Sequence, residues 1–134
     1  MAAIALLLSI TSCNGSIPVE SHWSVESLYS NGSQIEIPAG HNPGISFLKD
    51  SKIAGETGCN RFFGDFRTDG AEISFANMGS TRMMCPQMAF ENSYMQALDN
   101  VASFEFETDK LILKDKDGNT IVVLKKMDVN GQEN

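Results

Sequence analysis

Positively charged residues are scarce in this chain. Its 134 residues include 10 Lys and Arg against 17 Asp and Glu, for a formal net charge of −7. Nucleic-acid binders neutralise phosphates with a basic face, so this balance argues against DNA or RNA as a partner. Charged residues make up only 20% and hydrophobic residues 42%, which excludes a mainly disordered chain. The length suits one small acidic globular domain.

Long apolar runs are also missing, apart from one at the start. Residues 2–10 are almost wholly apolar, but a helix that crosses a bilayer needs about 20 such residues. The run is typical of the hydrophobic part of a secretion signal. It leads into Ile10-Thr11-Ser12-Cys13, which resembles the bacterial lipobox, the motif whose cysteine is acylated. We expect a lipoprotein signal peptide over residues 1–12 and a lipid anchor at Cys13.

One feature of the start favours a different interpretation. No Lys or Arg precedes the apolar run, although a signal peptide normally begins with positive charge. The alternative is a buried N-terminal strand or helix in which Cys13 is an ordinary thiol. Residues 14–18 resemble a flexible spacer, which agrees better with an anchor and tether.

Only three cysteines are present. If Cys13 carries lipid, Cys59 and Cys85 remain as a pair, and an exported chain enters an oxidising compartment. We expect these two residues to form a disulfide, worth roughly 3.5 kcal/mol in the chain-entropy model. A metal site or a cysteine nucleophile is the weaker alternative, because neither His22 nor His41 lies near a cysteine in the sequence.

Short alternating segments dominate the chain from residue 22 onward. Strand patterns occupy residues 22–28, 45–47, 52–54, 61–67, 72–75, 104–107, 111–113 and 120–124, with turn dipeptides such as Asn31-Gly32 and Asp69-Gly70 between them. Residues 86–100 instead place their apolar side chains on one helical stripe, formed by Phe90, Tyr94, Ala97, Leu98 and, just beyond, Val101. The order of five strands, one helix and three strands predicts a mainly β, α+β fold. We expect a small antiparallel sheet, curled and barrel-like, with the helix covering an end or an open edge.

Two motifs in the middle of the chain carry a family resemblance. Residues 58–64 (Gly-Cys-Asn-Arg-Phe-Phe-Gly) fit the pattern GCN-x-x-x-G, and residues 81–85 (Thr-Arg-Met-Met-Cys) fit TxMxC. Glu91 follows six residues after the second motif. Together with Trp23 and the strand pattern at residues 111–113, these motifs resemble the META domain, or HslJ-like, family over about residues 20–126.

The resemblance implies a β-rich, barrel-like fold with one helix and a disulfide between the two motif cysteines. Family members are often envelope or secreted proteins, many of them lipoproteins. One is heat-inducible and linked to novobiocin tolerance, and others are linked to motility or virulence. No catalytic activity is established for the family, so the resemblance implies none here.

The motif residues have structural roles in this interpretation: Gly58, Asn60, Gly64, Thr81, Arg82 and Glu91. We expect Asn60 to adopt a left-handed turn or to cap a strand through its amide, rather than to line a ligand site. The two glycines fit bulges or close backbone approaches. We expect a semi-buried Arg82 to pair with Glu91 or Asp65 and lock the helix to the sheet. The alternative is an anion site that binds a carboxylate of a partner.

Methionines gather in one region, because five of the seven lie within residues 78–95: Met78, Met83, Met84, Met88 and Met95. Their spacing favours ordinary packing beneath the helix. One alternative is an adaptable apolar groove for a partner, with Met83, Met84 and Met88 as candidate binding residues. The other is a Cu(I) site. We expect no bound metal and no cofactor.

Motifs for catalysis or phosphate binding are absent from the sequence. Residues 115–119 (Asp-Lys-Asp-Gly-Asn) resemble the start of a calcium loop, but Lys126 stands where the loop needs a bidentate Glu, so we expect a hairpin turn. Glu105 and Glu107 fall on the outer side of a strand, where solvated charge is the usual state. We expect no catalytic residues.

These features divide the chain into a signal peptide (1–12), a tether (13–20), a META domain (21–127) and a flexible tail (128–134). We expect a monomeric, non-catalytic lipoprotein of the bacterial envelope, in the outer membrane and facing the periplasm. Its predicted role is stress tolerance through binding of an envelope protein or an apolar ligand. The alternative is a small-molecule or Cu(I) carrier. An enclosed apolar cavity beside Met83, Met84 and Met88 would favour the carrier, and a filled core with an exposed apolar patch would favour the binding module.

Overall fold

The computed structural model describes residues 15–86 and 88–128. The predicted signal peptide, Cys13 and all of the predicted tail except Asp128 lie outside these residues. The described part contains strands β1 (Ser21–Ser30), β2 (Ser33–Ile35), β3 (Gly44–Leu48), β4 (Lys52–Glu56), β5 (Arg61–Asp69), β6 (Glu72–Ser80), β7 (Ser103–Glu107), β8 (Lys110–Lys114) and β9 (Thr120–Lys126), with a 3-10 turn (Lys49–Ser51) before β4 and helix α1 (Met88–Asn100) between β6 and β7.

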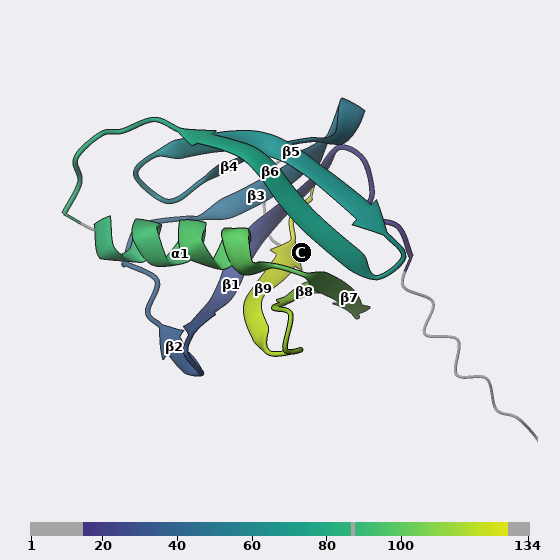
Figure 1. The fold of residues 1–134 in the computed structure, drawn as a ribbon. Coiled ribbons are helices and arrows are strands. Elements are labelled where there is room, and N and C mark those ends of the chain that lie inside the picture. Colours follow the sequence, from purple (N-terminus) through teal and green to yellow (C-terminus); the bar gives the residue numbers. More distant parts are fainter. Residues whose placement is uncertain (1–14, 87, 129–134) are drawn as a thin grey trace, which may run out of the picture.

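The strands form one antiparallel sheet that curls into a ring. Their order is β2-β1-β3-β4-β5-β6-β7-β8-β9, and a further pairing of β1 with β9 closes the ring. The joint between β6 and β7 is short, with Glu72 paired to Ser103. Helix α1 crosses the open side of the ring, between β6 and β1 (Figure 1). The predicted mainly β fold with one covering helix is therefore confirmed.

Strand β2 was not expected from the sequence, so six strands precede the helix instead of five. It has three residues, of which only Ile35 is partly buried, too few to show an alternating pattern. The turn that leads into it was expected. Asn31 and Gly32 both have positive φ, 51° and 80°, as two-residue hairpin turns require.

Side chains fill the interior of the ring. Alternation along the strands turns Leu111 and Leu113 inward, and both are fully buried. Phe62 and Phe66 face inward from β5, where Phe66 meets Phe47 edge to face at 5.1 Å between ring centroids. The whole predicted helical stripe is buried against these strands: Phe90, Tyr94, Ala97, Leu98 and Val101. Burial of this apolar surface is the main stabilising term of the fold.

The folded part begins earlier than the predicted boundary at residue 21. Ile17, which was expected in the tether, is buried and belongs to the core cluster. Ser21 donates a hydrogen bond to the carbonyl of Pro18 at 2.6 Å, which fixes the turn into β1. In Figure 1 this segment lies at the opposite end of the molecule from the loop between β6 and α1.

Candidate functional site

The two sequence motifs meet at the start of β5, where Asn60 is 1% exposed. Its side-chain amide donates to the carbonyl of Met83 (3.1 Å) and accepts from the amide of Met83 (2.8 Å). Its oxygen also accepts from the hydroxyl of Thr81 at 3.0 Å. The side chain of Asn60 therefore pairs with the backbone of Met83 as a neighbouring strand would, and it also binds the side chain of Thr81. The predicted structural role agrees with this geometry, but the left-handed conformation was wrong, because the φ of Asn60 is not positive.

Thr57 extends this polar network to the helix. Its hydroxyl donates a hydrogen bond to the carboxylate of Glu91 at 2.7 Å. The same hydroxyl oxygen accepts a hydrogen bond from the backbone N–H of Asn60 at 3.0 Å. Thr57 and Glu91 are both buried, so the network fastens α1 to the turn between β4 and β5. Sequence reasoning missed Thr57. Its only signal was its place immediately before the GCN motif.

The structure joins Cys59 to Cys85 in a disulfide, with 6.4 Å between their Cα atoms and a sequence separation of 26. This spacing lies within the usual range for disulfides. The bond and the Asn60 network hold residues 81–85 at two adjacent points. We call residues 81–86 the Met loop.

Gly58 and Gly64 are required by their surroundings. Gly58 has φ +106°, and a Cβ there would lie 2.5 Å from Nδ1 of His41. Gly64 lies at a register shift between β5 and β6, and a Cβ there would lie 2.6 Å from the sulfur of Met78. The predicted close approach and bulge agree with these positions.

The ion pair predicted for Arg82 is wrong. Arg82 is exposed and takes part in none of the ion pairs found within the described residues. Glu91 bonds to Thr57 instead, and Asp65 pairs with Lys52. The side chain of Thr81 bonds to Asn60, whereas that of the next residue, Arg82, lies toward solvent.

The core packing predicted for the methionines is wrong for two of the five. Met78 and Met95 pack against the core, and Met88 is half-buried. Met83 is 58% exposed, however, and Met84 is 89% exposed. The prediction counted Met84 and Met88 as helix neighbours, but α1 begins only at Met88. The Met loop is fixed through its backbone and Cys85, so these two side chains are not needed in the core.

A third exposed apolar side chain, Phe63, lies close to the Met loop in the fold. Phe63 points outward from β5 and is 56% exposed, while its ring lies over Gly79 of β6. Arg61, two residues earlier, exchanges two hydrogen bonds with Thr81 at the start of the loop. The sequence signal for Phe63 was its position beside Phe62, since two neighbouring strand residues cannot both face the core.

An open hollow of about 530 Å³ extends from Phe63 across β4, β3 and β1. Its floor follows one row of paired residues, in which Phe63, Ala54, Ser46 and His22 are neighbours in turn. His22 and Ser46 are hydrogen bonded at 2.6 Å. Small residues in the middle of the row leave room beside the Phe63 ring. Met83 and Met84 do not line this hollow, but they follow Thr81, which is hydrogen bonded to Arg61 at its edge. We call Phe63, Met83 and Met84, together with this hollow, the apolar surface.

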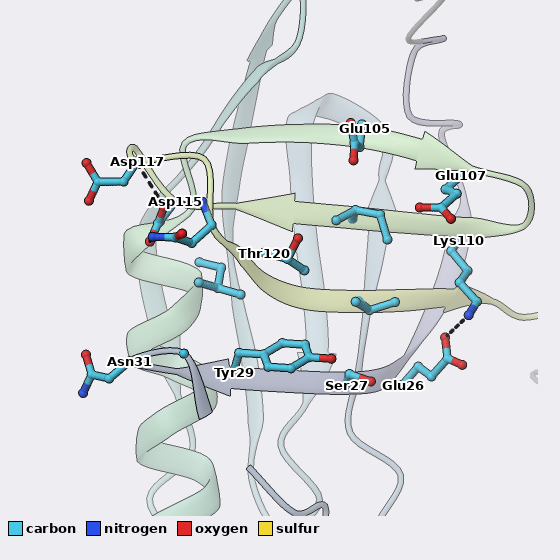
Figure 2. A pocket seen from close by; sticks show the side chains of 15 residues that line it. Glu26, Ser27, Tyr29, Asn31, Glu105, Glu107, Lys110, Asp115, Asp117 and Thr120 are labelled. Atoms are coloured by element: carbon cyan, nitrogen blue, oxygen red, sulfur yellow. Dashed lines mark hydrogen bonds and ion pairs between the residues drawn. The ribbon is translucent and has the colours of Figure 1, made fainter. Parts of the chain in front are cut away.

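A larger hollow, of about 930 Å³, lies on the outer face of β7, β8, β9 and β1. Figure 2 shows the carboxylates of Glu26, Glu105 and Glu107 projecting onto this face. Lys110 pairs with Glu26 at 3.1 Å, and Lys114 pairs with Glu105 at 3.0 Å. These are exposed pairs, which contribute little to stability, so the face matches the solvated charge expected for Glu105 and Glu107.

The turn at one end of this face is the predicted hairpin. The carboxylate of Asp115 accepts hydrogen bonds from the backbone amides of Asp117 (3.0 Å) and Asn119 (2.9 Å). These donors hold the pKa of Asp115 below its usual value of 3.8. Asp115 and Asp117 also lie at the edge of the hollow in Figure 2.

Among residues 15–86 and 88–128, no group of three or more His, Cys, Asp and Glu side chains is arranged to hold a metal ion. Within the same residues no helix has the length and apolarity to cross a membrane.

Burial raises the pKa of Tyr94 far above its usual value of 10.0, because the charged form would lose its hydration.

The closed antiparallel sheet, the covering helix and the disulfide between the two motifs define a small α+β domain. A model of the META domain family matches residues 17–128. The chain therefore belongs to the META domain family.

Three solved structures share this fold. One is an NMR structure of a protein from Burkholderia xenovorans, with a TM-score of 0.67 at 22% identity, covering 81% of this chain and 82% of the other. Another NMR structure has a TM-score of 0.59 at 28% identity, with 79% and 88% covered. A crystal structure of a DUF4847 family protein from Bacteroides vulgatus has a TM-score of 0.58 at 17% identity, with 80% and 92% covered. No curated protein matches the chain.

Proposed function

We propose that this chain is a non-catalytic binding module of the bacterial cell envelope that binds a protein partner through the apolar surface. One observation carries the proposal: Phe63, Met83 and Met84 are 56%, 58% and 89% exposed on and beside a loop that the disulfide and Asn60 hold in place. Side chains fill the interior of the ring. Exposed apolar side chains gathered on one surface are typical of interaction sites. Methionine and aromatic residues are also enriched in interfaces.

The anchor and location follow from the sequence. The lipobox-like residues 10–13 place a lipid on Cys13, and the protein is a monomer held in the outer membrane and facing the periplasm. The folded part starts at the end of the molecule opposite the Met loop (Figure 1). A tether attached there directs the Met loop away from the membrane, toward other envelope proteins. The family resemblance supports a role for this binding in envelope stress tolerance.

A small-molecule or Cu(I) carrier is the second candidate function. Met83, Met84 and Met88 line neither of the hollows described above, and the interior beneath the helix is occupied by side chains. These observations favour the binding module over the carrier. A Cu(I) titration tests the rival directly: we expect no tight site, and a site lost in Met84→Leu with Met88→Leu would favour the carrier.

Site-specific photo-crosslinking in intact cells tests the binding function. A crosslinking amino acid replaces Phe63 in one variant and Val19 in another. Val19 is the matched control, because it is 59% exposed but belongs to the segment at the end of the molecule opposite the Met loop (Figure 1). We expect a protein adduct of defined mass from position 63. Equal adducts from both positions, or none from position 63, would contradict the proposal.

Membrane fractionation tests the anchor independently. Cys13→Ser removes the acylated residue, and we expect this variant to leave the membrane fraction while the wild-type chain remains there. Cys59→Ser with Cys85→Ser is the control, since it changes two cysteines without touching the lipobox. Unchanged fractionation of Cys13→Ser would remove the anchor from the proposal and leave the binding surface as it stands.

A further inference from the structure

Exposure sets two methionines apart from Met78, Met88, Met95 and Met127, which are all half-buried. Met84 is 89% exposed and Met83 is 58% exposed, whereas Met78 and Met95 pack against the core. Oxidation of methionine requires contact between the thioether and a dissolved oxidant, so its rate follows exposure. The motif cysteines are joined in a disulfide and do not compete as thiols.

The Met loop also keeps its shape without the two methionine side chains. Asn60 holds the loop through the backbone amide and carbonyl of Met83, and Cys85 holds it through the disulfide. A change at either sulfur therefore alters the surface of the loop and leaves its attachments intact. Sulfoxide formation in a core has the opposite effect, because it places a polar group among packed side chains.

We propose that Met84 and Met83 form an oxidation site, and that their oxidation by peroxide converts the apolar surface into a polar one and releases its partner. Each thioether takes one oxygen atom from hydrogen peroxide. The sulfur is oxidised by two electrons to the sulfoxide and the peroxide is reduced to water. The sulfoxide oxygen is a strong hydrogen-bond acceptor that loses its hydration in an apolar interface. The loss of partner binding rests on the proposed function, and the site of oxidation does not.

Peptide mapping by mass spectrometry tests the oxidation site. The purified full chain is treated with limiting hydrogen peroxide and digested at successive times. We expect sulfoxide at Met84 first and at Met83 next, several-fold faster than at Met78 and Met95, with no shift in the unfolding midpoint while only these two sites react. Equal rates at Met78 and Met95, or loss of the fold at partial oxidation, would overturn the site.

Crosslinking from position 63 tests the effect on binding. Cells are exposed to peroxide before irradiation, in the wild-type background and in Met83→Leu with Met84→Leu, which stays apolar and cannot form sulfoxide. We expect peroxide to abolish the adduct in the first background and to leave it in the second. An adduct that survives oxidation of Met84 would overturn the release. If no adduct forms even without peroxide, the proposed function fails and the release fails with it, while the mass data still decide the oxidation site.

Discussion

The hydroxyl of Tyr94 donates a hydrogen bond to the backbone carbonyl of Gly44 at 3.0 Å, joining α1 to the first residue of β3. The side chain of Tyr94 is fully buried, and its ring meets Phe62 edge to face at 5.7 Å between centroids. Gly44 is also a point of close backbone contact, since a Cβ there would lie 2.5 Å from the carbonyl oxygen of Trp23. The helix is thus fastened to the sheet at its centre by a polar bond inside an apolar core.

The first prediction concerns high pH. Burial raises the pKa of Tyr94 above its usual value of 10.0, so the folded state keeps the proton that the unfolded state releases. The stability supplied by Tyr94 is complete below pH 10 and falls as the pH rises above it. Tyr94→Phe removes the titrating hydroxyl and with it this dependence of stability on pH. It also removes the hydrogen bond to Gly44, so we expect it to lower the free energy of unfolding at neutral pH by about 1–3 kcal/mol.

Denaturant unfolding at a series of pH values measures both effects. We expect the stability of wild type to fall more steeply above pH 10 than that of Tyr94→Phe. Tyr29→Phe, on the outer face of β1, is the control. Parallel curves for wild type and Tyr94→Phe would contradict the assignment.

The second prediction concerns the disulfide between Cys59 and Cys85. Replacing both with Ser frees a long loop of the unfolded chain, and we expect a loss of roughly 3.5 kcal/mol in the free energy of unfolding. Mass spectrometry of the wild-type chain without reductant should find the two cysteine peptides linked. Free thiols at both positions would remove the covalent tie between the motifs and leave only the Asn60 network.

The third prediction concerns low pH. Hydrogen bonds from Lys52 and Asn77 hold the pKa of Asp65 below its usual value of 3.8. A lowered pKa in the folded state supplies stability that is present above pH 3.8 and is lost as the pH falls through the folded value. Asp65→Asn should therefore flatten the acid side of the stability curve. Asp69→Asn, at the far end of β5, is the control, and equal curves for both variants would rule out the Lys52–Asp65 contact.

Periodicity predicted the fold because the two-residue period of the strands and the helical period of residues 86–100 were both strong. The helical stripe and the inward-facing residues Leu111 and Leu113 are buried as expected. Burial of an apolar face determines the orientation of both the helix and the strand. The site was harder to predict. Asn60 and Glu91 were singled out through the family resemblance, but their common partner Thr57 becomes visible only in three dimensions, where residues far apart in sequence meet.

The failures at the Met loop have one physical cause. The spacing treated Met84 as a helix neighbour of Met88, and Met83 was expected in the core with the rest of the cluster. Arg82 was expected to be semi-buried. Hydrogen bonds between the side chain of Asn60 and the backbone of Met83 hold these residues in a loop that precedes α1, so helical spacing does not apply to them. A loop that is fixed by main-chain hydrogen bonds leaves its side chains free to point outward. No pattern of residue types in the sequence predicts this orientation.

The last prediction concerns Asn60 itself. Asn60→Ala removes the acceptor and the donor that pair with Met83 and the acceptor used by Thr81. Buried groups left without partners are costly, so we expect a loss of about 2 kcal/mol in the free energy of unfolding. The amide of Met83 should also exchange with solvent faster, because local opening of the loop no longer breaks a hydrogen bond.

Two readouts separate this local role from a general loss of stability. Hydrogen exchange in Asn60→Ala should rise at Met83 several-fold more than at core amides such as that of Leu113, which report global unfolding. Asn92→Ala, on an exposed position of α1, is the matched control and should change neither. Uniform acceleration across the chain would mean that Asn60 stabilises the whole domain without specifically holding the Met loop. Because the proposed partner surface requires Met83 and Met84 to be presented on a fixed loop, a selective effect at Met83 would tie the family motif directly to that surface.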